Sequence, residues 1–264
     1  MPSSTPTVSI VVPARNEARN LELVLPLLPA VHQVVLVDGH SVDDTIETAR
    51  RVLPGIDVVQ QTRKGKGNAL ACGFAAATGD IIVMFDADGS ADASEIPSFV
   101  RALVEGADVA KGSRYIRGGG SEDITRFRSL GNLFLNTATN VLLGSRYTDL
   151  CYGYHAFWRR LVPGLHLPNH EMATDGMVWG DGFEIETVLN CRFFLGGHRI
   201  VEVPSVEKSR IFGESNLNAI RDGFRVLRTI LAERAHARST SRRAAVEDVR
   251  SSTRIDPNVA RKAA

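Results

Sequence analysis

The feature that most constrains the fold is a series of short apolar runs, each bounded by turn residues, in the first half of the chain. Such runs are typical of parallel strands that are buried on both faces. The predicted strands are 8–12, 34–37, 57–60, 81–85 and 108–110. Helical patterns fall between them, at 21–28, 44–52, 68–77 and 95–105. This alternation predicts an α/β fold around a mostly parallel, twisted sheet with right-handed crossovers.

The second half of the chain gives a different pattern. We predict helices at 127–143, 183–194 and 216–233, an extended segment at 146–159 and a strand at 199–203. From residue 235 onward the chain is rich in Arg, Ser and Ala and has few large apolar residues. Such a segment cannot bury enough surface to offset the entropy lost on ordering, so 235–264 is predicted to be a disordered basic tail. The alternative for this tail is a polybasic clamp on anionic lipid.

Composition excludes several classes of protein. The net charge of +1 argues against a nucleic-acid partner, because a phosphate backbone demands a strongly basic surface. No run approaches the roughly 20 apolar residues of a membrane span, and the start lacks the features of a signal peptide. The widely spaced cysteines, Cys72, Cys151 and Cys191, fit neither a disulfide framework nor a zinc site. We therefore expect a cytoplasmic protein without a transmembrane segment.

Two carboxylates stand directly after the predicted strand at 81–85. Asp86 and Asp88 flank Ala87, and alternation along a strand would send both side chains to the same side. Carboxylates this close repel each other unless a cation neutralises them. Mg²⁺ or Mn²⁺ commonly binds one or two carboxylates together with substrate phosphates. The alternative is a solvated acidic loop, but the buried strand leading into the pair favours a metal site.

A glycine-rich basic segment precedes that strand. Gly65 and Gly67 allow close backbone approach, and a helix begins near Asn68, where its N-terminus favours an anion. The positive charge comes from Arg63, Lys64 and Lys66. The segment predicts a diphosphate site, although it is no P-loop because no GK[ST] follows the glycines. The alternative is a solvated basic turn.

Polar residues also follow the first two predicted strands, where a parallel sheet places its ligands. After the first strand come Pro13, Ala14, Arg15, Asn16 and Glu17. Asp38 follows the second strand, and a carboxylate there can accept hydrogen bonds from the N–H groups of a nucleotide base.

The order of five motifs, PARNE, VDGHSVDDT, GKGNAL, DADGS and KGSRY, resembles family 2 glycosyltransferases with the GT-A fold. Within that family the chain is most similar to the dolichyl- and polyprenyl-phosphate mannose or glucose synthases. The resemblance covers roughly residues 7–232 and implies a Rossmann-like, mostly parallel sheet with a C-terminal extension on the acceptor side. It further implies one GT-A domain over 1–234, with a nucleotide-sugar half at about 1–115 and an acceptor half at about 116–234.

The same resemblance assigns the donor site. The donor would be a nucleotide-diphosphate sugar, carrying UDP or GDP. Its base and ribose would be held by Pro13, Ala14, Arg15, Glu17 and Asp38. Lys66 and Gly67 would lie near the diphosphate, and Asp86, Ala87 and Asp88 would form the metal motif. Ser90 stands where some lipid-phosphate members carry a glutamine ligand.

The acceptor implied by the resemblance is a polyprenyl or dolichyl phosphate, reached at the inner face of a membrane. The predicted acceptor-binding residues are Arg114, Arg126, Arg128, Arg210 and Ser215. Arginines that converge on one point repel each other unless an anion compensates them, which favours a bound phosphate. The prenyl chain would follow the apolar face of the helix at 127–143, along Phe134, Leu135, Val141 and Leu142.

The predicted catalytic residues are Asp88, Asp149 and Glu184. Asp149 is implied to be a base or an acceptor-orienting carboxylate, in a single displacement that inverts the anomeric centre. Glu184 and Glu186 resemble an F-E-x-E pair of the family. Residues two apart on a helix do not share a face, so we expect only one of these glutamates to serve the site.

Other functions stay open on the sequence alone. The same donor chemistry could act on a soluble or polysaccharide hydroxyl, for which Asp149 would take the proton; Asn216, which stands where family members usually carry a lysine, favours this reading. A sugar-1-phosphate nucleotidyltransferase would want a glycine-rich loop after the first strand, where this chain has PARNE. A nucleotide-sugar binder without turnover is the alternative from outside the enzymes.

Overall fold

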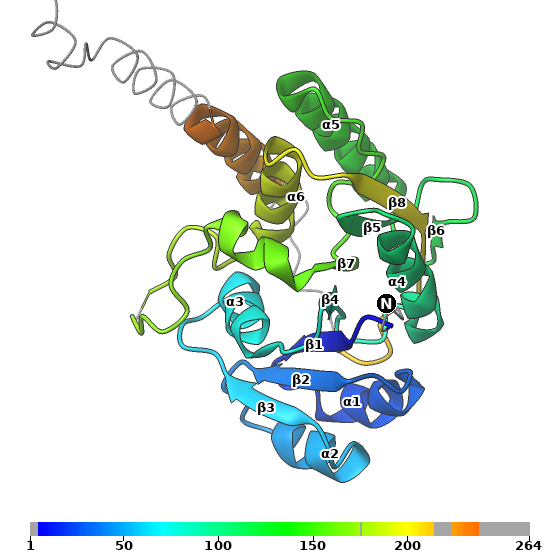
Figure 1. Cartoon of the computed structure of the whole chain (residues 1–264), viewed down its shortest axis with the longest axis vertical. Coiled ribbons are helices and arrows are strands. Elements are labelled where there is room, and N and C mark those ends of the chain that lie inside the picture. The colour runs from blue at the N-terminus through cyan, green and yellow to red at the C-terminus, as the bar shows by residue number, and fades with distance from the viewer. Residues whose placement is uncertain (1–4, 175, 214–222, 238–264) are drawn as a thin grey trace, which may run out of the picture.

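The computed structural model describes residues 5–174, 176–213 and 223–237. Its main feature is a seven-stranded sheet in the order β3-β2-β1-β4-β7-β5-β8 (Figure 1). The strands are β1 (Val8–Ala14), β2 (Gln33–Asp38), β3 (Asp57–Gln60), β4 (Ile81–Met84), β5 (Val109–Ser113), β7 (His155–Trp158) and β8 (Ile200–Pro204). β7 pairs antiparallel with β4 and β5, and the other pairs of the sheet are parallel. The predicted α/β fold with a mostly parallel sheet is confirmed.

Helices cover both faces of this sheet, which is why its strands read as continuous apolar runs. One face carries α1 (Ala18–Val24), η1 (Leu25–Leu27), α2 (Thr45–Val52), η2 (Ala93–Glu95) and α4 (Ile96–Val104). The opposite face carries α3 (Lys66–Ala76), η3 (Arg159–Leu165) and α6 (Ile185–Leu195). Successive residues of β1 serve the two cores in turn, since Ile10 and Val12 join the first cluster and Val11 the second.

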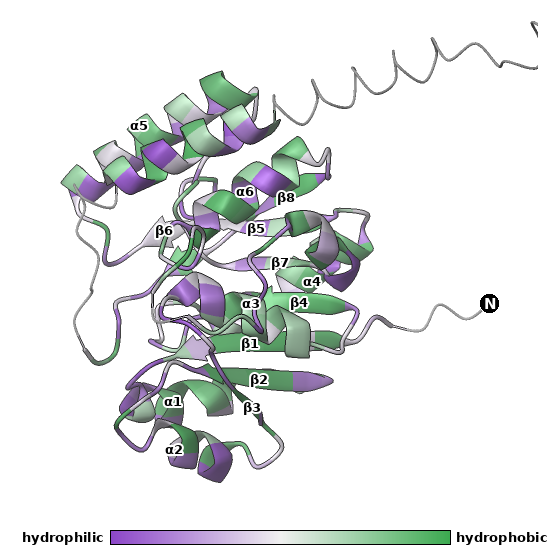
Figure 2. Ribbon diagram, turned by 90° about the vertical axis from the view of Figure 1, so that its left-hand side faces the viewer, coloured by the Kyte–Doolittle hydropathy of each residue, from purple (hydrophilic) through white to green (hydrophobic). Residues whose placement is uncertain are grey.

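A third apolar cluster joins elements from the second half of the chain. Leu135 of α5 (Arg126–Leu143) packs with Leu150, with Cys191 of α6 and with Ile230 of a helix at 223–237. Figure 2 shows α5 at the end of the molecule opposite α1 and α2, with β1 and β4 strongly hydrophobic between them. A second, two-stranded sheet pairs β6 (Gly120–Ser121) with β9 (Val206–Glu207) and connects the chain near α5 to the segment after β8.

The predicted extended segment at 146–159 is wrong over most of its length. Only His155–Trp158 forms a strand, and η3 begins directly after it. The preceding loop is irregular because side chains of α5 take its backbone groups: Asn140 Oδ1 accepts from the Tyr147 N–H, and Asn136 Oδ1 accepts from the Leu150 N–H. The predicted helix at 216–233 is described from residue 223, and residues 235–237 of the predicted tail continue it. The rest of that tail lies outside the described residues.

No helix in the described part of the chain has the length and hydrophobicity needed to cross a bilayer.

The packing of α3 on the sheet generates a stability prediction at Gly73. A Cβ added there would meet the side chains of Val11 and Val37, so Gly73→Ala should lower the free energy of unfolding by about 1–3 kcal/mol. Gly131 of α5 is the matched control, because nothing lies within 4 Å of an added Cβ. Gly131→Ala should raise the free energy of unfolding by about 0.5–1 kcal/mol through helix propensity. Urea unfolding measures both, and equal midpoints for the two variants would contradict this packing.

Candidate active site

A cavity of about 1360 Å³ opens where β1, β4 and β5 end at their carboxyl termini. The chain after these strands lines it, together with the start of α3, the start of α6, α5 and residues 207–213. Of the predicted donor residues, those that line the cavity are Pro13, Ala14, Arg15, Glu17, Lys66, Asp86, Ala87 and Asp88. Asp38 and Gly67 are buried and do not line it.

Asp86 and Asp88 lie just beyond the carboxyl end of β4. The N–H of Phe85 still bonds to the carbonyl of Val11 at 3.0 Å, so the sheet holds the motif up to that residue. Asp88 Oδ1 then accepts from the backbone N–H of Ser90 at 2.9 Å and from its hydroxyl at 2.7 Å. Ser90 therefore orients Asp88 and leaves Asp88 Oδ2 free to bind elsewhere.

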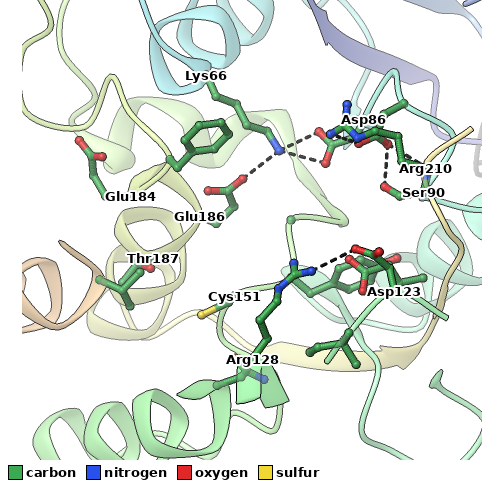
Figure 3. A pocket seen from close by; sticks show the side chains of 18 of the residues that line it. Lys66, Asp86, Ser90, Asp123, Arg128, Cys151, Glu184, Glu186, Thr187 and Arg210 are labelled. Atoms are coloured by element: carbon green, nitrogen blue, oxygen red, sulfur yellow. Dashed lines mark hydrogen bonds and ion pairs between the residues drawn. The ribbon is translucent and has the colours of Figure 1, made fainter. Parts of the chain in front are cut away.

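Each motif carboxylate is paired with a basic side chain (Figure 3). Lys66 Nζ lies 2.7 Å from Asp86 Oδ1 and 2.9 Å from Glu186 Oε1. Arg210 NH2 lies 2.7 Å from Asp88 Oδ2, and its NH1 lies 3.4 Å from a carboxylate oxygen of Glu17. Burial alone would lower the pKa of the Lys66 ammonium, but its two carboxylate neighbours outweigh burial and raise that pKa above its ordinary value.

These residues fit a divalent metal. Asp86 and Asp88 offer hard oxygen ligands at the cavity wall, and they attract two positive charges from Lys66 and Arg210. Within the described ranges no group of three acidic, histidine or cysteine side chains could hold a metal. A site with two carboxylates is typical of Mg²⁺, which takes its remaining ligands from substrate phosphates and water.

The loops after β1 and β2 are bonded to each other beside the carboxylates. Ser41 Oγ accepts from the N–H of Asn16 at 2.9 Å, and the Gly39 N–H donates to the carbonyl of Ala14 at 2.8 Å. Asp38, at the end of β2, is only 1% exposed, and its carboxylate accepts from the Ser41 N–H at 3.2 Å. Of the predicted base-binding residues, Pro13, Ala14, Arg15 and Glu17 thus line the cavity, whereas Asp38 does not. Contact with a base stays a prediction.

The basic glycine-rich segment does not have the structure that the sequence predicts. Arg63 is fully buried, and its Nε lies 2.7 Å from Asp181 Oδ2. Its charge is therefore neutralised inside the protein by Asp181. Added Cβ atoms at Gly65 and Gly67 would collide with the backbone of Asp181 and Gly180. The glycines are therefore required by the close approach of the 180–181 loop, and only Lys66 of this segment points its charge at the carboxylates.

Two of the residues predicted for the acceptor site, Arg114 and Asp149, form a buried ion pair. Arg114 Nε and NH2 donate to the two oxygens of Asp149 at 2.7 and 2.9 Å, while NH1 donates to Glu207 at 2.9 Å. The backbone N–H of Arg114 and the amide of Asn132 each donate a further bond to the Asp149 carboxylate at 3.1 Å, and Asp149 is 0% exposed. Burial would raise the pKa of the Asp149 carboxyl, but Arg114 holds that pKa below its usual range. Both oxygens of the predicted base are therefore occupied and enclosed.

Three of the four predicted arginines, Arg114, Arg128 and Arg210, line the cavity, and each of these three already has a carboxylate partner. Arg128 pairs with Asp123 at 3.0 Å, as Figure 3 shows, and Arg210 pairs with Asp88, away from the Arg114–Asp149 pair. The mutual repulsion that suggested a bound phosphate is thus compensated within the protein. Arg126 opens α5 and does not line the cavity, and Ser215 lies outside the described residues.

Glu184 and Glu186 both face the cavity, against the expectation that only one would. Glu184 is the N-cap of α6 rather than part of its helix, so the helical spacing argument does not apply to the pair. Its Oε1 accepts from the N–H of Gly180 at 3.2 Å, and its Oε2 lies 3.8 Å from Arg225 Nε. Glu186 holds Lys66 and was absent from the predicted catalytic set, because no sequence pattern shows which lysine it meets.

An apolar wall faces the charged end of the cavity. It consists of four side chains of α5 that are between 60% and 65% exposed, namely Phe127, Leu130, Leu133 and Phe134. Leu135, also predicted to contact the prenyl chain, lines the cavity although it is buried. Val141 and Leu142, predicted to contact the same chain, do not line the cavity.

Comparison with known proteins defines the class. The family model described as glycosyl transferase family 2 matches residues 9–163. Glycosyltransferase AglJ of Haloferax volcanii is 31% identical over 226 residues, 82% of this chain and 68% of the relative. The chain therefore belongs to glycosyl transferase family 2. This membership confirms the family resemblance and the prediction of a glycosyltransferase.

Particular relatives differ in what they cover. An uncharacterized glycosyltransferase of Mycobacterium tuberculosis is 42% identical over 107 residues, which are 40% of this chain and 48% of that relative. Dolichol-phosphate mannosyltransferase of Pyrococcus furiosus is 29% identical over 228 residues, 80% of this chain and 59% of the relative. The chain thus spans about half to three fifths of the length of these curated relatives.

A solved structure confirms the predicted GT-A fold. Glucosyl-3-phosphoglycerate synthase from Mycobacterium tuberculosis, in complex with Mn²⁺, uridine-diphosphate and glucosyl-3-phosphoglycerate, superposes with a TM-score of 0.66. It is 25% identical to this chain and covers 87% of it and 80% of its own length.

The Arg114–Asp149 pair generates a prediction for stability against pH. Asp149→Asn leaves the buried guanidinium without its main partner and should cost about 3–5 kcal/mol of unfolding free energy at pH 7. Because the folded pKa of Asp149 is depressed, its contribution is present above the ordinary value of 3.8 and is lost as pH falls through the folded pKa. The gap between wild type and variant should therefore narrow in acid, as measured by urea unfolding at several pH values.

Asp123→Asn is the control for that series. Asp123 pairs with Arg128 at the surface, with 48% of its side chain exposed, so its loss should cost less than about 1 kcal/mol. Equal costs for the two variants, or a gap for Asp149→Asn that does not depend on pH, would contradict the buried pair.

Proposed function

We propose that this chain transfers a hexose from a nucleotide-diphosphate sugar to a polyprenyl or dolichyl phosphate, with inversion at the anomeric carbon. The observation that carries the proposal is the cavity itself, which joins a charged end at Asp86, Asp88 and Lys66 to an apolar wall on α5. One cavity thus offers a polar site for a sugar diphosphate and an apolar surface for a lipid chain.

The donor assignment is supported by the family and by the residues at the charged end. Glucosyl-3-phosphoglycerate synthase, of the same fold, was crystallised with Mn²⁺ and uridine-diphosphate-glucose. In this chain Asp86 and Asp88 would hold Mg²⁺ or Mn²⁺, which when bound would supply Lewis-acid stabilisation of the leaving diphosphate. Lys66 would donate to the same leaving group, as preorganised electrostatic catalysis requires. The loop after β1, with Arg15 lining the cavity, would take the nucleoside, and Asp38 would fix the neighbouring loop after β2 through Ser41.

The acceptor assignment is supported by the state of Asp149. A hydroxyl acceptor needs a base to remove its proton, and both oxygens of Asp149 are bound to Arg114. A phosphate acceptor is already an anion at neutral pH and needs no such base. Asp149 would then serve to fix Arg114, a residue that lines the cavity.

Arg128 is the best-placed cation for the acceptor phosphate. It lines the cavity from the first turn of α5, beside Phe127 of the apolar wall. Its partner Asp123 is half exposed, and such surface pairs contribute only about 0–1 kcal/mol, so a phosphate could displace Asp123 at low cost. A lipid bound there would bring the chain to the inner face of a membrane as a peripheral enzyme.

A small phosphorylated acid is the second candidate acceptor. The similar synthase from Mycobacterium tuberculosis was crystallised with phosphoglyceric acid and with glucosyl-3-phosphoglycerate. Arg128 could bind the phosphate of such a molecule equally well. The apolar wall would then have no role in the acceptor site, which separates the two candidates experimentally.

The donor half of the proposal predicts a metal-dependent gain in stability. A nucleotide sugar at about 100 times its Kd should add about 2.7 kcal/mol to the unfolding free energy. UDP-glucose or GDP-mannose should produce this gain with Mn²⁺ and lose most of it in EDTA, in thermal-shift measurements. Asp88→Asn should fold but show little metal-dependent gain. An undiminished gain in EDTA would show that the donor needs no metal.

The acceptor half predicts which side chains of α5 matter. Phe134→Gln should raise the KM for a short-chain prenyl phosphate about tenfold, because losing part of an apolar contact costs about 1.4 kcal/mol. Val141→Gln is the control, since Val141 is 78% exposed on the same helix but does not line the cavity. The donor KM should stay unchanged in both. Radiolabelled sugar extracted into organic solvent measures the transfer, with phosphoglyceric acid as the competing acceptor. Label that passes only to phosphoglyceric acid would refute the lipid assignment.

A further inference from the structure

The two carboxylates of the metal motif share one arrangement that the donor assignment does not require. Each is paired with a basic side chain, and each basic side chain is also held by a second carboxylate from another part of the fold. Lys66 lies between Asp86 and Glu186, as Figure 3 shows. Arg210 lies between Asp88 and Glu17.

We propose that Lys66 and Arg210 are a built-in counter-charge for Asp86 and Asp88, which a divalent metal replaces. Glu186 and Glu17, the outer carboxylates, then keep the two displaced cations beside the donor site. The proposal rests on the proposed function in one respect, namely that Asp86 and Asp88 bind the metal.

Charge balance predicts how metal binding changes the affinity for the nucleotide. Two side-chain cations carry together the charge of one divalent ion, so the motif carboxylates are neutralised equally before and after exchange. With Glu186 and Glu17 included, the four carboxylates and two side-chain cations carry a net charge of −2, and a bound divalent ion brings this to zero. A nucleotide diphosphate is an anion, so it is repelled less once the metal is bound. Metal and nucleotide therefore bind with positive coupling, each raising the affinity for the other.

Glu186 is a positioning residue in this scheme. The side chain of Lys66 is only 16% exposed, and a cation so enclosed would be costly if metal binding left it unpaired. Glu186, whose side chain is 10% exposed in the first turn of α6, remains its partner. Lys66 is thereby kept close to the position of Asp86 instead of turning into solvent.

Arg210 is held by its backbone as well as by Glu17. The N–H of Ile211 donates to the carbonyl of Asp88 at 3.1 Å, and the N–H of Lys208 donates to the carbonyl of Ser90 at 2.8 Å. The segment that carries Arg210 is thus bonded to the motif loop on both sides of the arginine. Release of the Arg210 side chain from Asp88 need not move this segment away from the site.

The test measures Mn²⁺ affinity directly, by electron paramagnetic resonance of the free ion, without and with UDP. Lys66→Met removes the competing cation, so nucleotide-free Mn²⁺ should bind about tenfold more tightly, within the range usual for coupled equilibria. The gain in Mn²⁺ affinity that UDP brings should shrink. Lys64→Met is the matched control, because Lys64 is an exposed lysine of the same segment. The Mn²⁺ affinity of this variant should stay at the wild-type value.

Glu186→Gln separates a positioning residue from a metal ligand. It should leave nucleotide-free Mn²⁺ affinity close to wild type and weaken UDP binding in the presence of Mn²⁺. Loss of nucleotide-free Mn²⁺ binding in Glu186→Gln would make Glu186 a ligand and overturn the proposal. So would a Lys66→Met variant that binds Mn²⁺ no more tightly than Lys64→Met. If Lys66→Met does not fold, the double variant Lys66→Met/Glu186→Gln removes the ion pair as a unit and should show the same tightening.

Asp86→Asn distinguishes failure of this proposal from failure of the proposed function. Wild-type Mn²⁺ affinity in Asp86→Asn would refute the metal assignment and the exchange together. Tightened Mn²⁺ binding in Lys66→Met, without transfer to prenyl phosphate by the wild-type protein, would support the exchange and refute only the acceptor.

Discussion

The ion pairs of Lys66 tie together the parts of the molecule that form the cavity. Its ammonium connects the start of α3 to the motif after β4 and, through Glu186, to the first turn of α6. These elements come from positions far apart in the chain and lie at one edge of the sheet. One cation shared by two carboxylates thus joins three elements that border the polar end of the cavity. The apolar wall, carried by α5, is placed independently through the third core cluster.

The clustering of Asp86, Asp88 and Lys66 could be predicted from the sequence because its signals are local. Buried parallel strands leave continuous apolar runs, and the residues after those runs must lie at the carboxyl edge of the sheet. This argument predicted Asp86 and Asp88 at that edge, the glycine-rich segment predicted Lys66 nearby, and all three line one cavity. The glycine-rich segment also predicted Arg63 and Gly67 near the diphosphate, because a sequence does not show that Asp181 pairs with Arg63 or that residues 180–181 pass close to Gly67.

The acceptor half was harder to predict because its partners are distant in sequence. Arg114 was expected to meet a phosphate, whereas its guanidinium is bound by Asp149 and Glu207, 35 and 93 residues away. An unpaired arginine and a paired one look identical in a sequence. The prediction that only one of Glu184 and Glu186 would face the site was wrong for another reason. Residues two apart point to different faces only inside a helix, and α6 begins after Glu184.

The antiparallel strand β7 sets the spacing between two strands that lead into the cavity. It lies between β4, which leads to Asp86, and β5, which leads to Arg114, and pairs with both through backbone hydrogen bonds. Neighbouring strands are about 4.8 Å apart, so β4 and β5 are separated by roughly 10 Å. A backbone ladder, unlike a loop, does not stretch when side chains change. Substitutions among the side chains that line the cavity would therefore leave the separation of these two strand ends unchanged.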